Sequence, residues 1–400
     1  MSGPLAGIRV LDLTTVLLGP YGSMLLADMG ADVIKIEAPE GDVMRLAGPH
    51  VTPGMGPVYL NGNRNKRAIA LDLKADAGKQ ALRKLIATAD VFIHNMRPAA
   101  IERLGFGYEQ VREVKDDIVY CGAYGFAKDG PYADRPAYDD LIQCMSGLAG
   151  LFERTTGEPR LVPTVVCDKL IGLTVSQAVS MALVHKFRTG EGQAVEVPMF
   201  ETMVSWLMVE SQYGHVFDPP KAGYGYQRLM TPHRKPYPTK DGHMCVLPYT
   251  NKQWGKLFEL VGTPDKIDEP PFHDHTTRIE RVDEVYGYLA DLLLTRTNDE
   301  WMEICREAQI PASPVIRVED LETDPHMLAV DMFHSYDHPT EGRLRTTKVP
   351  VTFSKTPGGF RRAAPNYGEH GAEVLREAGY SDDEIETLQR DGVLLKEKRR

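Results

Sequence analysis

The 400-residue sequence lacks several features that would assign a function at once. Its five cysteines are scattered and form no CxxC pair, so their spacing fits no zinc site and predicts free thiols in a reducing cytoplasm. No apolar run reaches eighteen uninterrupted residues, and the N-terminus has no charged region followed by a long apolar segment. The net charge of −10 disfavours nucleic acid as a general partner. We therefore expect a cytoplasmic protein without a membrane span, a signal peptide, a nucleic-acid partner or a bound metal.

Nucleotide-binding fingerprints are missing as well. The first strand–helix turn carries Leu18-Gly19-Pro20 where a dinucleotide-binding protein has GxGxxG, and no P-loop pattern occurs in the chain. These absences count against an oxidoreductase that uses a nicotinamide cofactor. A nucleotide-like ligand would have to be held by other means.

Strand and helix patterns alternate through the first half of the chain, which predicts an α/β fold with a Rossmann-like large domain and a parallel sheet. A stretch rich in Pro, Gly and Tyr then indicates a linker or lid, and a smaller α+β pattern follows it. The predicted organisation is a large domain over 1–216, a linker or lid over 217–236, a small domain over 237–325 and a return to the large domain over 326–400.

The stretch from Leu161 to Gly190 organises the chain. From Leu170 to Val184 its only strongly polar residue is Gln177, which predicts a helix buried nearly all round with Asp168 at its N-cap. Asp168 has two interpretations. It caps the helix by accepting backbone N–H bonds, or it is a carboxylate nucleophile that forms covalent acyl intermediates. The stretch alone leaves both open.

Charged and aromatic residues near the predicted strand ends add further candidates. Arg64, Lys66 and Arg67 precede a strand and are either a solvated basic turn or a patch that binds phosphates. The loop 125–140 follows another strand, where parallel sheets bind ligands. Tyr138, at its end, either packs at a helix start or lines a site.

Six segments together resemble the class III CoA-transferase family, whose members include formyl-CoA transferase and carnitine CoA-transferase and whose fold also serves alpha-methylacyl-CoA racemase. The similarity runs over nearly all 400 residues. It is carried by VLDLTTVLLGPYGSMLLADMGADVIKIE, NRNKRAIALDLK, DVFIHNMRPAAIERLGFGYE, PAYDDLIQCMSGLAG, the apolar run that ends in Asp168, and KFRTGEGQAVEVPMFE.

The resemblance implies that Asp168 is the covalent nucleophile and that coenzyme A is both substrate and product. It implies an interlocked homodimer that acts on an acyl-CoA and a free carboxylic acid. It implies substrate-pocket roles for Tyr138 and Asp139 in the loop around Ala137. The implied CoA contacts are Val16, Leu17, Leu18, the segment Leu71 to Lys74, Asn95, Met96, Arg97 and Arg103. Of the basic residues, we favour Arg97 and Arg103 for the phosphates.

Some positions depart from the family pattern. Leu17 and Ala38 stand where formyl-CoA transferase has Gln and Arg, and Gly223-Tyr224-Gly225-Tyr226 replaces its glycine-run loop. Formyl and oxalate chemistry is therefore disfavoured. We expect amides near Gly223 and Gly225 to stabilise oxyanions.

The predicted function is CoA transfer through an aspartyl-acyl anhydride and an aspartyl-CoA thioester. The racemase branch has a His at the position of Tyr138, and tyrosine is a poor base at neutral pH. The alternatives are an acyl-CoA racemase or epimerase that acts at the α-carbon, and a non-catalytic CoA-binding protein. Arg228, His233 and Arg234, near the lid, are candidates for binding the second carboxylate of a dicarboxylic acid.

Overall fold

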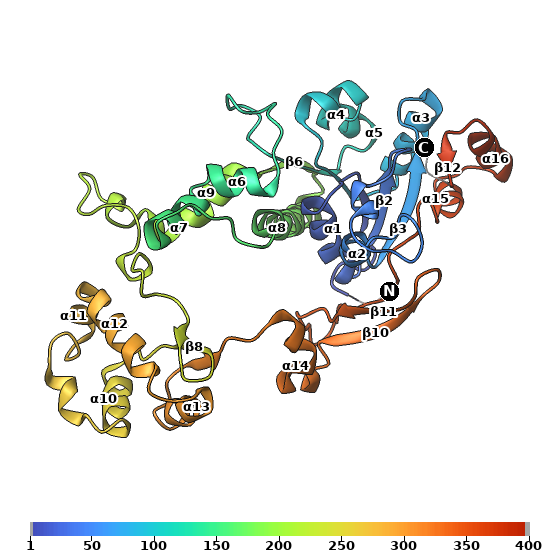
Figure 1. Cartoon of the computed structure of the whole chain (residues 1–400). Coiled ribbons are helices and arrows are strands. Elements are labelled where there is room, and N and C mark those ends of the chain that lie inside the picture. Colours follow the sequence, from blue (N-terminus) through green and yellow to red (C-terminus); the bar gives the residue numbers. More distant parts are fainter. Residues whose placement is uncertain (1–2, 397–400) are drawn as a thin grey trace. The chain divides into compact units, whose positions relative to one another are not determined.

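Residues 3–396 are described by a computed structural model in which the chain forms two units (Figure 1). The first unit contains the chain up to Ser146, Leu161–Ser205 and the chain from His326 onward. The second unit contains Gly147–Arg160 and Trp206–Pro325. The expected large domain therefore differs from the first unit, because residues 147–160 and 206–216 pack with the second unit.

A seven-stranded sheet forms the centre of the first unit, in the order β12-β3-β2-β1-β4-β5-β6. All neighbours are parallel except β12, which is antiparallel to β3. This order from β3 to β6 is that of a doubly wound α/β fold, so the Rossmann-like prediction is confirmed. The strands are β1 (Arg9–Asp12), β2 (Asp32–Glu37), β3 (Lys66–Leu71), β4 (Val91–His94), β5 (Val119–Tyr124), β6 (Gln193–Pro198) and β12 (Leu394–Leu395).

One face of this sheet is covered by five helices. Leu11, Ile34 and Phe92 point to this face from three strands and join the main apolar core. Their strand neighbours point to the opposite face, because side chains alternate along a strand. The five helices are α3 (Asp76–Ile86), α4 (Pro98–Leu104), α5 (Tyr108–Val114), α15 (Gly371–Glu377) and α16 (Asp382–Arg390).

The other face is covered by α1 (Leu18–Asp28) and α8 (Val166–Thr189), which lie side by side (Figure 1). Glycines allow their backbones to meet. A Cβ atom on Gly22 would lie 2.7 Å from the carbonyl oxygen of Gly172, and one on Gly172 would lie 2.6 Å from the carbonyl oxygen of Leu18. This contact holds the first two turns of α1 against the second turn of α8.

Helix α8 differs from its prediction in two ways. It is 24 residues long with Val165 at the N-cap, so Asp168 is its third residue and the N-cap prediction is wrong. Burial all round is also wrong, because Leu173, Met181, Val184 and Phe187 are 55–65% exposed. These four residues form one stripe that faces neither α1 nor the sheet. Within residues 3–396, α8 is also the one helix whose length and composition would suffice to cross a membrane.

The first unit is completed by short elements, two of which lie between β2 and β3 in the chain. These two are η1 (Val43–Leu46) and α2 (Pro57–Gly62). The others are α6 (Asp139–Met145), α14 (Pro325–Ala329), the antiparallel hairpin of β10 (Phe333–His338) and β11 (Gly342–Thr347), and α9 (Met199–Ser211), whose last turns belong to the second unit.

The second unit has a three-stranded antiparallel sheet and an aromatic core around Trp254, Phe258, Phe272 and Trp301. The expectation of a smaller α+β unit is thus met. Its strands are β7 (Tyr237–Pro238), β8 (His243–Val246) and β9 (Ala312–Pro314). Its helices are α7 (Leu148–Thr156), α10 (Asn251–Leu260), α11 (His275–Glu280), α12 (Val282–Leu293) and α13 (Asn298–Glu307), with 3-10 turns η2 (Tyr213–Val216), η3 (Gln227–Leu229), η4 (Pro264–Asp268) and η5 (Val318–Thr323).

Candidate active site

A cavity of about 70 Å³ lies at the carboxyl ends of β1, β4 and β5. The strand order reverses between β1 and β4, and doubly wound sheets bind ligands at such a switch point. Five residues predicted from the sequence line it together: Val16, Leu18, Asn95, Tyr138 and Asp168. The remaining lining residues are Thr15, Ala123, Tyr124, Gly125, Ala137 and Met199.

Asp168 reaches this cavity from the first turn of α8 and is 8% exposed. Within residues 3–396, no hydrogen bond or ion pair reaches its carboxylate oxygens, and its side chain caps no helix. Burial raises the pKa of Asp168 to about 7, and the negative charges of Asp139 and Asp140 contribute to the rise. A buried, unpaired carboxylate that faces a cavity fits a nucleophile better than a helix cap.

Asp139 lies beside Asp168 but does not line the cavity. Its Oδ1 accepts the backbone N–H of Asp168 at 3.0 Å, and its Oδ2 accepts from Gln143 Nε2 at 2.6 Å. Gln143 Oε1 in turn accepts the N–H of Val162 at 2.8 Å. Asp139 and Gln143 thus attach α6 to the segment that leads into α8. The family resemblance implies a substrate-pocket role for Asp139, whereas in the structure Asp139 contacts the backbone of the candidate nucleophile.

Neither interpretation of the basic segment Arg64 to Arg67, which runs into the start of β3, is correct. Arg64, Lys66 and Arg67 are all buried rather than solvated or open to a phosphate. Arg64 pairs with Asp28 at 2.8 Å and Lys66 with Asp12 at 3.1 Å. Arg67 pairs with Asp32, Glu373 and Glu377 at 2.6–2.8 Å. These three cations are neutralised inside the fold, which a linear sequence does not reveal.

Arg97 and Arg103, by contrast, are exposed at the start and in the last turn of α4. Arg97 Nη1 donates to the carbonyl of Asp134 at 3.0 Å. No carboxylate among residues 3–396 pairs with either guanidinium, which leaves both able to bind phosphate oxygens.

The other predicted CoA contacts lie in mixed surroundings. The Leu71 side chain is fully buried in the core and its backbone pairs with Leu394, so only Lys74 in that segment is exposed. Met96 packs against the same core, and Leu17 is half-buried near Gly62. Asn95 lines the cavity, but both ends of its side-chain amide bond the backbone of Thr15.

The lid residues belong to the second unit. The N–H of Gly225 donates to the carbonyl of Ser211 at 2.7 Å, so the expectation that it stabilises an oxyanion is wrong for this amide. Gly223 is exposed. Arg228 Nε donates to Tyr286 Oη at 2.8 Å. Arg228 and Arg234 line a cavity of about 260 Å³ in this unit, and His233 does not line it.

Three further residues, Thr15, Tyr124 and Met199, line the cavity and are not predicted from the sequence. Tyr124 ends β5, and the rule that ligands bind beyond parallel strand ends could have identified it. Burial raises the pKa of Tyr124 far above its ordinary value, so it stays a neutral phenol. Within residues 3–396, no group of three or more His, Cys, Asp or Glu side chains could hold a metal ion, and all five cysteines are free.

Comparison with known proteins agrees with this geometry. Residues 5–371 match the model of CoA-transferase family III. The sequence is 31% identical to the succinate–glutarate CoA-transferase of Agrobacterium fabrum, over 97% of each chain. It is 33% identical to the succinyl-CoA:mesaconate CoA-transferase of Haloarcula hispanica, over 94% of this chain and 97% of the relative. A CAIB/BAIF family protein from Brucella suis superposes with a TM-score of 0.79 at 28% identity, covering 94% of this chain and all of that one.

Proposed function

Since the chain belongs to CoA-transferase family III and is a CoA-transferase, we propose that it moves CoA from an acyl-CoA to a free carboxylic acid through covalent intermediates on Asp168. The observation that carries this proposal is the carboxylate of Asp168, which is buried, has no partner in the described part of the chain and faces the cavity at the switch point of the sheet.

In the first half of the reaction, an Asp168 oxygen attacks the thioester carbonyl of the donor. The C–S bond breaks, which gives an aspartyl-acyl anhydride and CoA thiolate. The thiolate attacks the aspartyl carbonyl of the anhydride and releases the donor acid, which leaves an aspartyl-CoA thioester. Because each step exchanges one activated carboxyl group for another, no additional energy source is consumed.

In the second half, the acceptor carboxylate attacks the aspartyl thioester and forms a new anhydride with release of the thiolate. The thiolate attacks the acceptor's carbonyl, which yields the new acyl-CoA and restores Asp168. The apolar walls at Val16, Leu18 and Met199 limit water around these intermediates. At the start of α1, the amides of Leu18 and Gly19 have no helical partner and suit the developing oxyanions. Arg97 and Arg103 bind the CoA phosphates in this scheme.

The epimerase alternative is less well supported. It needs two groups that exchange a proton across the α-carbon. The titratable groups in the cavity besides Asp168 are Tyr124 and Tyr138. Tyrosine is a poor general base at neutral pH, and the raised pKa of Tyr124 makes it poorer still.

Dicarboxylic acids are the proposed substrates. The relatives above are named for succinate, glutarate and mesaconate. The 260 Å³ cavity of the second unit is lined by the cations Arg228, Arg234 and Lys235 and by no carboxylate, which suits an anionic ligand. Exchange assays that start from succinyl-CoA should favour dicarboxylic over monocarboxylic acceptors of similar length.

A homodimer is also part of the proposal. The exposed stripe of α8, formed by Leu173, Met181, Val184 and Phe187, is the kind of apolar surface that a second chain would cover.

Mass spectrometry of the intact protein tests the mechanism. After incubation with succinyl-CoA, the wild type should carry an adduct that hydroxylamine removes and that maps to Asp168. Asp168→Ala should form no adduct and exchange no CoA, whereas the control Asp140→Asn, at an exposed neighbour, should keep both. Exchange by Asp168→Ala at near wild-type rate would contradict the mechanism.

A further inference from the structure

The turn from Thr14 to Val16 joins β1 to α1 and contributes Thr15 and Val16 to the wall of the Asp168 cavity. Five consecutive backbone polar groups in this turn are each bonded by a side chain. At Thr14, the N–H donates to Asp12 at 2.9 Å and the carbonyl accepts from Lys35 Nζ at 2.9 Å. At Thr15, the N–H donates to the Asn95 side chain at 3.0 Å and the carbonyl accepts from it at 2.8 Å. The N–H of Val16 donates to Asp42 Oδ1 at 3.2 Å.

Val16 explains why this turn needs such support. Its φ is +71°, in the left-handed region that β-branched residues very rarely adopt. Such a conformation persists only where the surroundings impose it, and strained residues of this kind gather at functional sites. Asp42 makes the direct contact with the strained residue, through the N–H of Val16.

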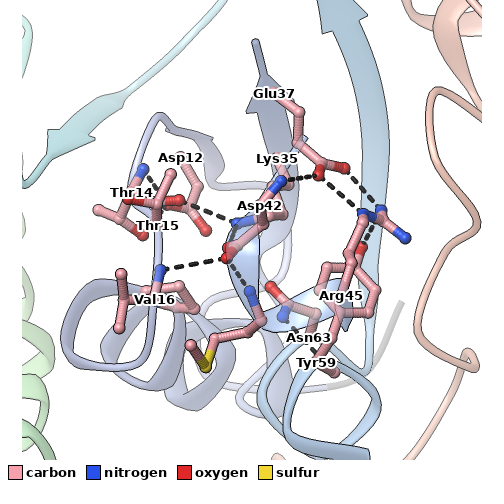
Figure 2. Close-up of polar contacts among 12 residues, drawn as sticks. Asp12, Thr14, Thr15, Val16, Lys35, Glu37, Asp42, Arg45, Tyr59 and Asn63 are labelled. Carbon is pink, nitrogen blue, oxygen red and sulfur yellow. Dashed lines mark hydrogen bonds and ion pairs between the residues drawn. The ribbon is translucent and has the colours of Figure 1, made fainter. Parts of the chain in front are cut away.

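Figure 2 shows that Asp42 is itself held by a buried network of charges. Lys35 Nζ bonds Asp42 Oδ2 at 2.9 Å, and the N–H of Asp42 donates to Glu37 Oε2 at 3.0 Å. Glu37 pairs with Arg45 at 2.6 Å, and Arg45 also bonds the Tyr59 hydroxyl. These side chains are all fully or almost fully buried. Burial by itself would raise the pKa of Asp42, but the charge and hydrogen bond of Lys35 bring it below its ordinary value, so Asp42 is an anion.

We propose that Asp42 is a positioning residue for the reaction at Asp168: through the N–H of Val16 it fixes the cavity wall made by Thr15, Val16 and Leu18. This inference rests on the proposed function. Covalent transfer requires the thioester carbonyl to lie within bonding reach of the Asp168 oxygen, and a wall displaced by about 1 Å can slow such a step about 100-fold. Asp42 does not line the cavity, so its effect on the reaction passes through the turn.

Asp42→Ala and Asp42→Asn test this proposal against a merely structural role. The rate of adduct formation by Asp42→Ala, corrected for the folded fraction, should fall about 10-fold or more. Asp42→Asn keeps an oxygen that can accept from Val16 N, so it should recover part of the rate and remains informative if the alanine variant fails to fold.

The matched control is Asp28→Asn. Asp28 is an equally buried carboxylate paired with a cation, Arg64, and does not touch the turn. It should lower the unfolding midpoint and leave the adduct rate of the folded protein unchanged. Equal slowing in Asp28→Asn and Asp42→Asn would overturn the proposal. A second result would also overturn it. In a Val16→Gly background no side chain is strained, so Asp42→Asn should slow adduct formation less there than in the wild type, and equal slowing in the two backgrounds would contradict the proposal.

Crystal structures of the wild type and Asp42→Ala separate this inference from the proposed function. We expect Val16 to leave the left-handed region in the variant. If the wild type forms no adduct, the proposed function fails, and the Val16 conformation in the two structures still decides whether Asp42 holds the turn. If both proteins react equally fast with Val16 unchanged, the function stands and the positioning role is refuted.

Discussion

Asp139 Oδ1 and the backbone N–H of Asp168 are joined by a 3.0 Å hydrogen bond, which fixes two carboxylates beside each other at the start of α8. Asp139 is buried and locked by Gln143, so its charge cannot move away from Asp168. After burial, this neighbouring charge is the largest contributor to the raised pKa of Asp168. The charge of Asp139 therefore lowers the fraction of Asp168 that is ionised near neutral pH.

The first prediction concerns the pH dependence of adduct formation. The ionised form attacks, so the rate should rise with pH and level off above about 7. Asp139→Asn removes a negative charge and should move the midpoint to lower pH. Asp140→Asn, the weaker of the two electrostatic causes, should move it less. Stopped-flow or quench profiles from pH 5 to 9 measure the midpoint for the wild type and for each variant. Identical profiles in the three proteins would contradict this role for Asp139.

The second prediction concerns stability. Asp168 has a folded-state pKa near 7 and an unfolded value of about 3.9. The folded state thus holds a proton that the unfolded state has lost, and stability falls as pH rises from about 4 to 7. Asp168→Asn removes this penalty and should be more stable than the wild type at pH 8, by up to about 4 kcal/mol at about 1.4 kcal/mol per pKa unit. Urea unfolding should show no such gain at pH 4.

The third prediction concerns the contact between α1 and α8. In Gly172→Ala the added Cβ would lie 2.6 Å from the carbonyl oxygen of Leu18, so the helices must separate. We expect a loss of about 1–3 kcal/mol in the free energy of unfolding, together with slower adduct formation, because the helix that carries Asp168 shifts. Gly255→Ala in α10 is the control. Nothing lies within 4 Å of its Cβ, so it should stabilise by about 0.5–1 kcal/mol.

The fourth prediction separates structural from ligand-binding arginines. Arg64→Gln leaves Asp28 buried without its cation and should cost about 3–5 kcal/mol of stability, with unchanged CoA affinity in the folded protein. Arg103→Gln changes an exposed residue, so stability should vary by about 0.5 kcal/mol or less. Its CoA affinity should fall about 10-fold, the worth of one charge-assisted bond. Calorimetric titration with CoA measures the affinity of both variants. A loss of affinity in Arg64→Gln with none in Arg103→Gln would indicate that the buried Arg64 binds the phosphates.

The fifth prediction tests the homodimer. Val184→Asp places a charge in the exposed stripe of α8 without touching the core of the chain. Sedimentation velocity should find a dimer for the wild type and a shift towards monomer for the variant. Ser381→Ala, at an exposed N-cap of α16, should leave the mass unchanged. A monomeric wild type at micromolar concentration would refute the dimer.

The sequence was sufficient for the parallel sheet because its strands are short apolar runs separated by helical periodicity, as at Asp32–Glu37 and Asp76–Ile86. It was not sufficient for β12, since two residues have no strand signal without β3 to pair with. It also misjudged α8, because an apolar composition does not distinguish a buried face from one left exposed in a single chain.

The sequence was likewise sufficient for some residues of the candidate site and not for others. Asp168, Val16 and Asn95 were predicted through motifs and lie together in the structure. Arg64, Lys66 and Arg67 were misassigned because their partners lie up to 310 residues away in the chain. Asp42 was missed because its role depends on the φ of Val16, which no residue pattern displays.

The pairing of β12 with β3 has a consequence for how the protein is made. β3 is complete once Leu71 has been synthesised, yet the strand that covers its outer edge is Leu394–Leu395, near the end of the chain. Throughout translation of the residues between them, β3 presents an open edge, and open edges recruit other strands. Until residues 394–395 have been synthesised, the edge of β3 is therefore open to pairing with strands of other chains.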